Sequence, residues 1–272
     1  MSERSALPAL ALICSLLAGC LGDQVAGGTG VGNPTKGSVV VALQAASGPE
    51  AMAKSGALRR NPDGTFTVLD AGGSAFIIRS GYANVGMVGL KLPTGIVCAD
   101  ADETECESDA IKIKGPFVAD LMTGKWQPDP GVFHVPSGSY TDMDIRFEPM
   151  DKASSGPDAG LNGHTLLIKG TFGYAGRSDR AFSIALDFNE DGSYVSPVGL
   201  GVKAQGLDTL IVLMNVDQWL SHADITACLD SGDLSLDAAG NLAIGKDSGC
   251  SDLENATKDA IKGSGNLKVR HD

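Results

Sequence analysis

The chain has 272 residues, of which 43% are hydrophobic and 20% are charged, and its formal net charge at pH 7 is −12. Because binding to a phosphate backbone needs a basic surface, this acidic balance excludes nucleic acid as an expected partner. The apolar content suffices for a buried core, and 36 glycines with few aromatic residues indicate many tight turns.

The first 19 residues have the layout of a secretory signal. A polar start carrying Arg4 precedes an apolar run of 12 residues, Ala6 to Leu17, and small residues follow at Ala18 and Gly19. A membrane-spanning helix needs about 20 residues, so this run is too short to stay as a transmembrane anchor. We therefore expect residues 1–19 to be removed.

The end of this signal, Leu17-Ala18-Gly19-Cys20, resembles the lipobox of bacterial lipoproteins. The resemblance implies that a diacylglyceryl group alkylates the Cys20 thiol, that cleavage falls before Cys20, and that the new amino group is acylated. Two or more acyl chains hold a protein firmly on a membrane. The alternative is an ordinary signal with a cysteine at this place. Because Leu21 replaces the Asp that resembles an inner-membrane retention signal, we expect a lipid anchor in the outer membrane, facing the periplasm or the cell surface.

The mature chain divides into three parts. Residues 20–36 contain five glycines and little to bury, which predicts a lipidated flexible tether. We expect a β-sandwich domain over residues 37–214 and a C-terminal helix and hairpin cap over residues 215–272.

The six cysteines also divide into three groups. Cys14 leaves with the signal and Cys20 takes the lipid. The remaining four are Cys98, Cys106, Cys228 and Cys250. An even number in an oxidising compartment predicts disulfides, and short loops favour Cys98 with Cys106 and Cys228 with Cys250. A zinc site is the alternative, but these cysteines lack the paired spacing and nearby histidines of such sites.

Period-two alternation of apolar and polar residues predicts strands along most of the chain. The clearest runs from Ser139 to Glu148, and Ala181 to Phe188 repeats the pattern before a predicted turn at residues 189–192. Further strands are predicted at residues 38–43, 65–69, 75–78, 82–92, 163–174, 193–203 and 209–216.

Two helices are expected, both late in the chain. Asn215 is predicted to cap a short helix that carries Trp219, and Ser251 with Glu254 forms a capping box for a helix that stops at Gly263. The fold class is therefore all-β, an antiparallel β-sandwich of the immunoglobulin or prealbumin type with a short helical, disulfide-stapled C-terminal cap. The alternative is two domains, separated at the Pro, Gly and Ser-rich residues 149–163.

Several segments are similar to β-sandwich domains of unknown function that recur in bacterial lipoproteins and are akin to prealbumin-like or carboxypeptidase-regulatory-like sandwiches. The resemblance covers roughly residues 37 to 205 and implies a fold and a location, with no catalytic residues. Its segments are Gly37 to Val41, Phe117 to Gly124, Pro136 to Thr141 and Phe182 to Phe188.

An acidic cluster is the candidate metal site. Carboxylates repel one another at close range, and Ca²⁺ bound through oxygen ligands would relieve that repulsion. The alternative is a solvated acidic loop, with no cofactor at all. The candidate ligands are Asp100, Asp102, Glu105 and Asp109.

Trp126, in a loop beside Lys125 and Pro128, is the candidate ligand-binding residue because its ring can stack on a sugar. The four histidines lie far apart, and no His-Glu-x-x-His or Gly-x-Ser-x-Gly motif is present. We therefore expect a non-catalytic envelope lipoprotein with a binding or structural role, whose partners are the membrane and an envelope protein or glycan. The alternatives are an adhesin module and a hydrolase of envelope polymers.

Overall fold

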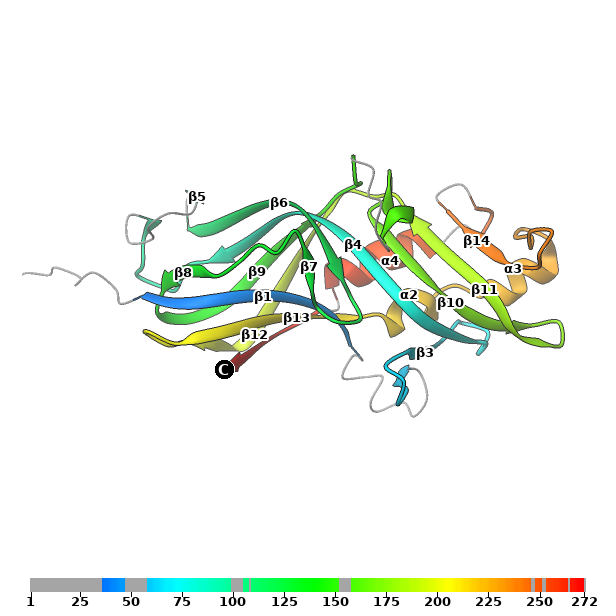
Figure 1. Cartoon of the computed structure of the whole chain (residues 1–272), viewed down its shortest axis with the longest axis horizontal. Helices are drawn as coiled ribbons and strands as arrows, with labels where there is room; N and C mark the ends of the chain where they lie inside the picture. The colour runs from blue at the N-terminus through cyan, green and yellow to red at the C-terminus, as the bar shows by residue number, and fades with distance from the viewer. Residues whose placement is uncertain are drawn as a thin grey trace, which may run out of the picture. The chain divides into compact units, whose positions relative to one another are not determined.

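Strands dominate the structure and form two sheets (Figure 1). The structure is a computed structural model, and it describes residues 36–46, 58–98, 105–107, 109–151, 158–245, 248–250, 253–263 and 265–271. All of these residues fall within one compact unit, residues 33–272. The predicted signal and Cys20 lie outside the described residues.

The smaller sheet has four strands in the order β15–β13–β1–β8. Strand β1 runs parallel to β13 and antiparallel to β8. Only the first residues of β1, Lys36 to Val39, pair with β8, so the rest of β1 lies beyond the end of that strand. The bounds are β1 (Lys36–Ala46), β8 (Phe133–Pro136), β13 (Leu207–Asn215) and β15 (Asn266–His271).

The larger sheet has 11 strands, and its main path runs β12–β9–β4–β10–β11–β14, with five further strands attached. Most pairs are antiparallel, but β11 and β14 are parallel. The main strands are β4 (Ala75–Lys91), β9 (Gly138–Phe147), β10 (Leu166–Tyr174), β11 (Arg177–Leu186), β12 (Glu190–Val202) and β14 (Leu242–Ile244). The attached strands are β2 (Leu58–Arg60), β3 (Phe66–Leu69), β5 (Glu105–Glu107), β6 (Ala110–Asp120) and β7 (Trp126–Gln127).

Two local predictions for this sheet are wrong. The strands predicted at residues 75–78 and 82–92 are a single strand, β4, which continues through irregular register at Ile78–Ser80 and Val85–Met87. The turn predicted at residues 189–192 is not a hairpin turn, because β12 already begins at Glu190 and pairs with β9, whereas β11 pairs with β10. The polar residues 189–192 therefore lie where the chain passes from β11 to β12, two strands that are not neighbours in the sheet.

The core lies on one face of the large sheet. Alternate residues of β9, Met143, Ile145 and Phe147, are fully buried there because period-two alternation points them to the same side. The small sheet covers one part of this face, where β1 and β15 contact β12. Helices cover the other part, where Trp219 is only 1% exposed (Figure 1). One continuous cluster of buried side chains joins both parts, and the predicted fold class, a β-sandwich with a disulfide-linked helical C-terminal part, is confirmed.

The helices are α2 (Asp217–Ser221), α3 (Ile225–Ser231) and α4 (Leu253–Gly263), with a 3-10 turn, η2 (Ala159–Leu161). The predicted cap at Asn215 is wrong, since Asn215 completes β13 and α2 starts after Val216 without a side-chain cap. Helix α3 was not predicted. Its Asp224 accepts a hydrogen bond from the Ala227 amide at 2.9 Å, which is a regular N-cap. None of the helices within the described part of the chain is long and apolar enough to cross a membrane.

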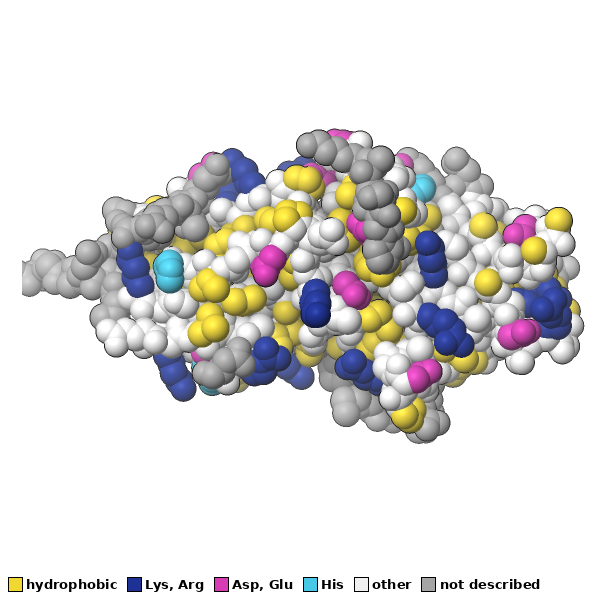
Figure 2. Space-filling view, viewed as in Figure 1, with side chains coloured by type: hydrophobic (Ala, Val, Ile, Leu, Met, Phe, Trp, Pro, Cys, Tyr) yellow, Lys and Arg dark blue, Asp and Glu magenta, His cyan; other side chains and the backbone are white. Residues whose placement is uncertain are grey.

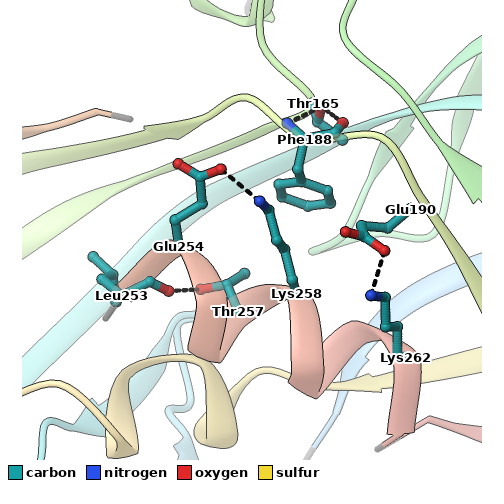
Figure 3. Close-up of polar contacts among 8 residues, drawn as sticks. All are labelled: Thr165, Phe188, Glu190, Leu253, Glu254, Thr257, Lys258 and Lys262. Carbon is teal, nitrogen blue, oxygen red and sulfur yellow. Dashed lines mark hydrogen bonds and ion pairs between the residues drawn. The ribbon is translucent and has the colours of Figure 1, made fainter. Parts of the chain in front are cut away.

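Helix α4 is held by polar contacts at both ends (Figure 3). Lys258 pairs with Glu254 one turn earlier, with 2.9 Å between Nζ and Oε1. Lys262 Nζ lies 2.5 Å from Glu190 Oε2 and so links the helix to the start of β12. The buried Thr257 hydroxyl donates to the Leu253 carbonyl at 2.8 Å, which satisfies a polar group inside the core.

Candidate functional site

Both predicted disulfides are present. Cys98 is bonded to Cys106 with a Cα–Cα distance of 5.4 Å, and Cys228 is bonded to Cys250 at 5.7 Å. The second joins α3 to the segment before α4, and Cys250 is itself 7% exposed within the core. The predicted pairing of the four cysteines is therefore confirmed.

The predicted calcium ligands are described only in part. Asp100 and Asp102 lie outside the described residues, Glu105 starts the short strand β5, and Asp109 is an exposed residue just before β6. Over the described ranges, His, Cys, Asp and Glu side chains form no group of three or more that could hold a metal ion. The calcium site stays a prediction, because two of its four ligands are not described.

Trp126 lies in a hairpin that leaves the large sheet. It pairs with Ala119 of β6 through β7, and its ring meets the edge of the Phe117 ring, with 5.8 Å between centroids and 86° between planes. Phe117 is buried, so this contact fixes the half-buried Trp126 ring against the core. The aromatic surface is therefore held in place before any ligand arrives.

The turn of this hairpin is built by Asp120. Its carboxylate accepts hydrogen bonds from the Met122 amide at 2.9 Å and the Thr123 amide at 3.3 Å, and its carbonyl accepts from the Gly124 amide at 2.7 Å. Gly124 has a φ of 75°, which is the left-handed region that favours glycine. The turn therefore has one well-defined shape.

The hairpin is attached to the small sheet beyond the end of β8. The Ala45 amide of β1 donates to the Leu121 carbonyl at 2.7 Å, and Gln44 Nε2 donates to the Thr123 carbonyl at 3.2 Å. Gln44 also packs against the turn, where a Cβ on Gly124 would lie 2.5 Å from its Nε2. A hairpin of the large sheet thus lies beside β1 and contacts Gln44 on the outer face of that strand.

A cleft of about 500 Å³ lies between this hairpin and the outer face of the small sheet. Ala42 and Thr209 form its floor and are only 8% and 6% exposed, although both point away from the main core. Arg270 of β15 stands at one side and donates to the Thr209 hydroxyl at 3.4 Å. The lining residues are Val40, Val41, Ala42, Gln44, Thr123, Gly124, Lys125, Trp126, Asp129, Thr209, Ile211 and Arg270.

The groups around the cleft combine an aromatic ring with many hydrogen-bonding side chains. Gln44, Thr123 and Thr209 supply amide and hydroxyl groups, Lys125 and Arg270 supply cations, and one carboxylate comes from Asp129. The Asp129 carboxylate accepts from the Gly131 amide at 2.8 Å, which orders the loop after β7. Such a set can stack on the apolar face of a sugar ring and bond its hydroxyls.

Two histidines have the partners that a hydrolase would need, but neither lines the cleft. His134 Nδ1 lies 3.1 Å from Ser38 Oγ on the exposed surface of the small sheet. His271 Nδ1 lies 2.5 Å from Asp208 Oδ1. Burial raises the pKa of the Asp208 carboxyl, but the hydrogen bonds from His271 and the Lys203 amide outweigh it, so the pKa lies below its ordinary value.

Most residues of the cleft could not be predicted from the sequence. Trp126 was predicted, and the structure places it at the cleft, but Gln44, Thr209 and Arg270 come from strands far away in the chain. Alternation in β1 does mark residues 40, 42 and 44 as one outward face, which is the local signal that was present. The parallel pairing of β1 with β13 that completes the floor leaves no such signal.

No protein-family model matches the sequence, and no curated protein matches it. Among solved structures, MbnP from Methylosinus trichosporium is similar at a TM-score of 0.31 and 12% identity, over 87% of this chain and 98% of that chain. This likeness is too distant to carry an inference about function.

Proposed function

We propose that this chain is a lipid-anchored lipoprotein of the bacterial cell envelope that binds a glycan, without catalysis, in the cleft beside Trp126. The lipobox-like segment ending at Cys20 supports the anchor, and two disulfides fit an oxidising compartment outside the cytoplasm. The observation that carries the binding role is the cleft itself, which Trp126, fixed against Phe117, lines together with several polar side chains.

The cleft suits a sugar better than a purely apolar ligand. Its floor is apolar at Ala42 and at the neighbouring Val40 and Ile211, but Thr209 and the walls carry hydroxyl, amide and charged groups that an apolar ligand would leave without partners. Its volume of about 500 Å³ lies in the range of small-molecule sites, which is roughly 300–1,000 Å³. A sugar ring offers both an apolar face for Trp126 and hydroxyls for Gln44 and Thr209.

The position of Trp126 allows a direct optical test. The chain has two tryptophans, so a Trp219→Phe variant leaves Trp126 as the only indole emitter. We expect tetrasaccharides of glucose, mannose or N-acetylglucosamine to change its emission saturably, in the full chain held in a non-glycosidic detergent. Isothermal titration calorimetry, which does not depend on indole emission, should show that Trp126→Ala weakens binding on the order of 30-fold, as for an aromatic hot spot of about 2 kcal/mol.

Matched variants separate stacking from unfolding. Trp126→Phe keeps an aromatic ring and should retain part of the affinity, whereas Gln44→Leu should remove hydrogen bonds with little change in size. Calorimetry on Trp126→Ala should still show a cooperative melt. If no saccharide perturbs the emission at millimolar concentration, the glycan proposal fails, and capture of a protein partner by the same face would favour the adhesin alternative.

The anchor is tested separately. Metabolic labelling with a fatty acid should label the wild type and leave Cys20→Ser unlabelled and outside the membrane fraction. Cys14→Ser changes the other cysteine of the signal and should keep the label. A wild type that takes up no label would contradict the anchor while leaving the cleft proposal intact.

A further inference from the structure

A second hollow lies on the opposite face of the large sheet from its core. Part of this outer face is covered, because Leu161 of η2 packs on Val118 and Leu167 as a small second core. Beyond that cover, a groove of about 430 Å³ opens over β4, β10, β11 and β14, which are neighbours in that order. It shares no lining residue with the Trp126 cleft.

The floor of the groove is low because its side chains are small. Ser183 of β11 pairs with Lys169 of β10 on one side and with Ala243 of β14 on the other, so these three side chains share a face. Ala181, two residues before Ser183, extends the same face and is exposed. The floor is therefore mostly apolar and open to a ligand.

Two cations stand at the β4–β10 end of the groove. Arg79 is exposed and Lys169 is half-buried, and neither makes an ion pair with a carboxylate of the described residues. Arg79 acts on Asp63, whose pKa is lowered chiefly by its hydrogen bonds with Thr65 and further by the charge of this arginine. Two unpaired cations together are notable in a chain with a net charge of −12, because carboxylates are in excess.

The far end of the groove is closed by the turn before β14. Asp237 of this turn accepts hydrogen bonds from the Ala239 amide at 2.9 Å and the Asn241 amide at 2.7 Å, so its carboxylate is engaged with its own loop. Strands lie about 4.8 Å apart, so β4 and β14 are separated by roughly 14 Å. The cations and the turn therefore mark two different ends of one apolar channel.

Figure 2 looks onto the strands of this region. Lys and Arg side chains lie over β4 and β10, next to a mostly white area over β10 and β11, where backbone and uncharged side chains outside the hydrophobic class form much of the surface. The lining residues Ala181 and Ala243, together with the two cations, resemble a small-molecule site, in which apolar groups surround a few placed charges. The two cations favour an anionic group in the ligand. The apolar floor beside them favours an anion that carries an apolar chain.

We infer that this groove binds a single-chain amphiphilic carboxylate, such as a medium-chain fatty acid. The carboxylate lies between Arg79 and Lys169, where charge-assisted hydrogen bonds are roughly twice as strong as neutral ones. The apolar chain lies along Ala181, Ser183 and Ala243 toward the turn at Asp237. The site is independent of the glycan proposal, because it lies on another face and uses other residues.

The test measures binding of radiolabelled decanoate to the full chain in phospholipid nanodiscs, with empty nanodiscs subtracted. We expect the labelled decanoate to bind saturably and to be displaced by unlabelled decanoate. The uncharged 1-decanol and the cationic decyltrimethylammonium should displace it poorly. The double variant Arg79→Gln/Lys169→Gln should bind on the order of tenfold more weakly or worse. Ser183→Leu, an outer-face change that fills the floor, should abolish binding.

Arg177→Gln is the matched control, because Arg177 is an exposed cation of the same sheet that pairs with Asp179 at 3.7 Å. It should bind decanoate like the wild type. Equal binding by the double variant, or no saturable binding above empty nanodiscs, would overturn the inference. So would a double variant that only loses attraction to phosphatidylglycerol vesicles, because the two cations would then serve a membrane surface.

Discussion

The two parts of the main core are covered in different ways. At one, the small sheet contacts β12, and the core side chains of the neighbouring β9 follow the alternation of that strand. At the other, α2, α3 and α4 supply the cover, and they depend on a disulfide and on buried polar contacts between distant segments. We conclude that the burial pattern of the strands in the sheet-covered part is specified locally, whereas the helix-covered part depends on specific long-range links.

The buried carboxylates illustrate the difference. Asp70, in the turn between β3 and β4, accepts from the Ser74 amide at 2.7 Å and the Thr226 amide at 3.3 Å, and so ties that turn to α3. Burial raises its pKa, and nearby Asp224 raises it further. Asp208, in the small sheet, has a lowered pKa. One carboxylate therefore opposes folding when charged, and the other favours it.

The largest expected effect comes from truncating a core side chain in each part. Trp219→Ala and Phe147→Ala should each lower the free energy of unfolding by about 3–5 kcal/mol, because both side chains are fully buried. Hydrogen exchange should show faster opening of α2 and α3 in Trp219→Ala, with β9 still protected. Equal acceleration in both parts would mean that the core unfolds as one unit.

Removing the disulfide of the helical part should have the next largest effect. The double variant Cys228→Ser/Cys250→Ser should lose about 3 kcal/mol by the chain-entropy model. The Cys98–Cys106 bond closes a loop of 8 residues rather than 22, so its removal should cost about 1 kcal/mol less. Chemical denaturation of both variants measures this difference, and the reverse order would contradict the assignment of the long-range link to the helical part.

The two carboxylates should give opposite dependences of stability on pH. Since the pKa of Asp70 is raised in the folded state, its protonated form favours folding, and stability should fall as pH rises from its ordinary value of 3.8 through the raised pKa. Asp208 should stabilise the fold above pH 3.8 and lose this contribution as pH falls through its lowered pKa. Urea melts of Asp70→Asn and Asp208→Asn across pH 2–7 measure each contribution as a difference from the wild type. The same slope in both differences would refute this pair of assignments.

The smallest expected effect lies on the surface of α4. Lys258→Met should remove the pair with Glu254 and lower stability by about 0.3–0.5 kcal/mol, less at high salt (Figure 3). Lys91→Met, an exposed lysine at the end of β4, is the control and should have little effect. A loss beyond 1 kcal/mol would show that this pair does more than the usual helix contact.

The strands were predictable because alternation is a local property. The predicted strand at residues 139–148 matches β9, and the predicted helix before Gly263 matches α4. The predicted helix cap at Asn215 was wrong because asparagine, a common N-cap residue, also fits the end of a buried strand. Helix α3 carried cap signals at Asp224 and Gly232, but it is only seven residues long, and its stability comes from packing and the disulfide.

The cleft and the groove were much less predictable. The sequence pattern of the strands that form the groove floor does not differ from that of other strands. Only the register of β10, β11 and β14 shows that Ser183 and Ala243 are neighbours. Trp126 could be singled out because tryptophan is rare in this chain, but its cleft needs the contact between Gln44 and the hairpin turn. Pairing between distant strands is set by tertiary packing, which single-residue patterns do not encode.

The Trp126 cleft takes its floor from one sheet and its wall from the other. Thr209 and Ala42 belong to the small sheet, whereas Trp126 belongs to the hairpin of the large sheet. A ligand that contacts residues of both sheets would link them, and the sheets could then separate only after the ligand dissociates. A ligand that binds only the folded state stabilises that state, so the occupied protein should withstand a larger pulling force than the empty one. If the proposed anchor and glycan are both present, that force would be transmitted between the membrane and the polymer that carries the sugar.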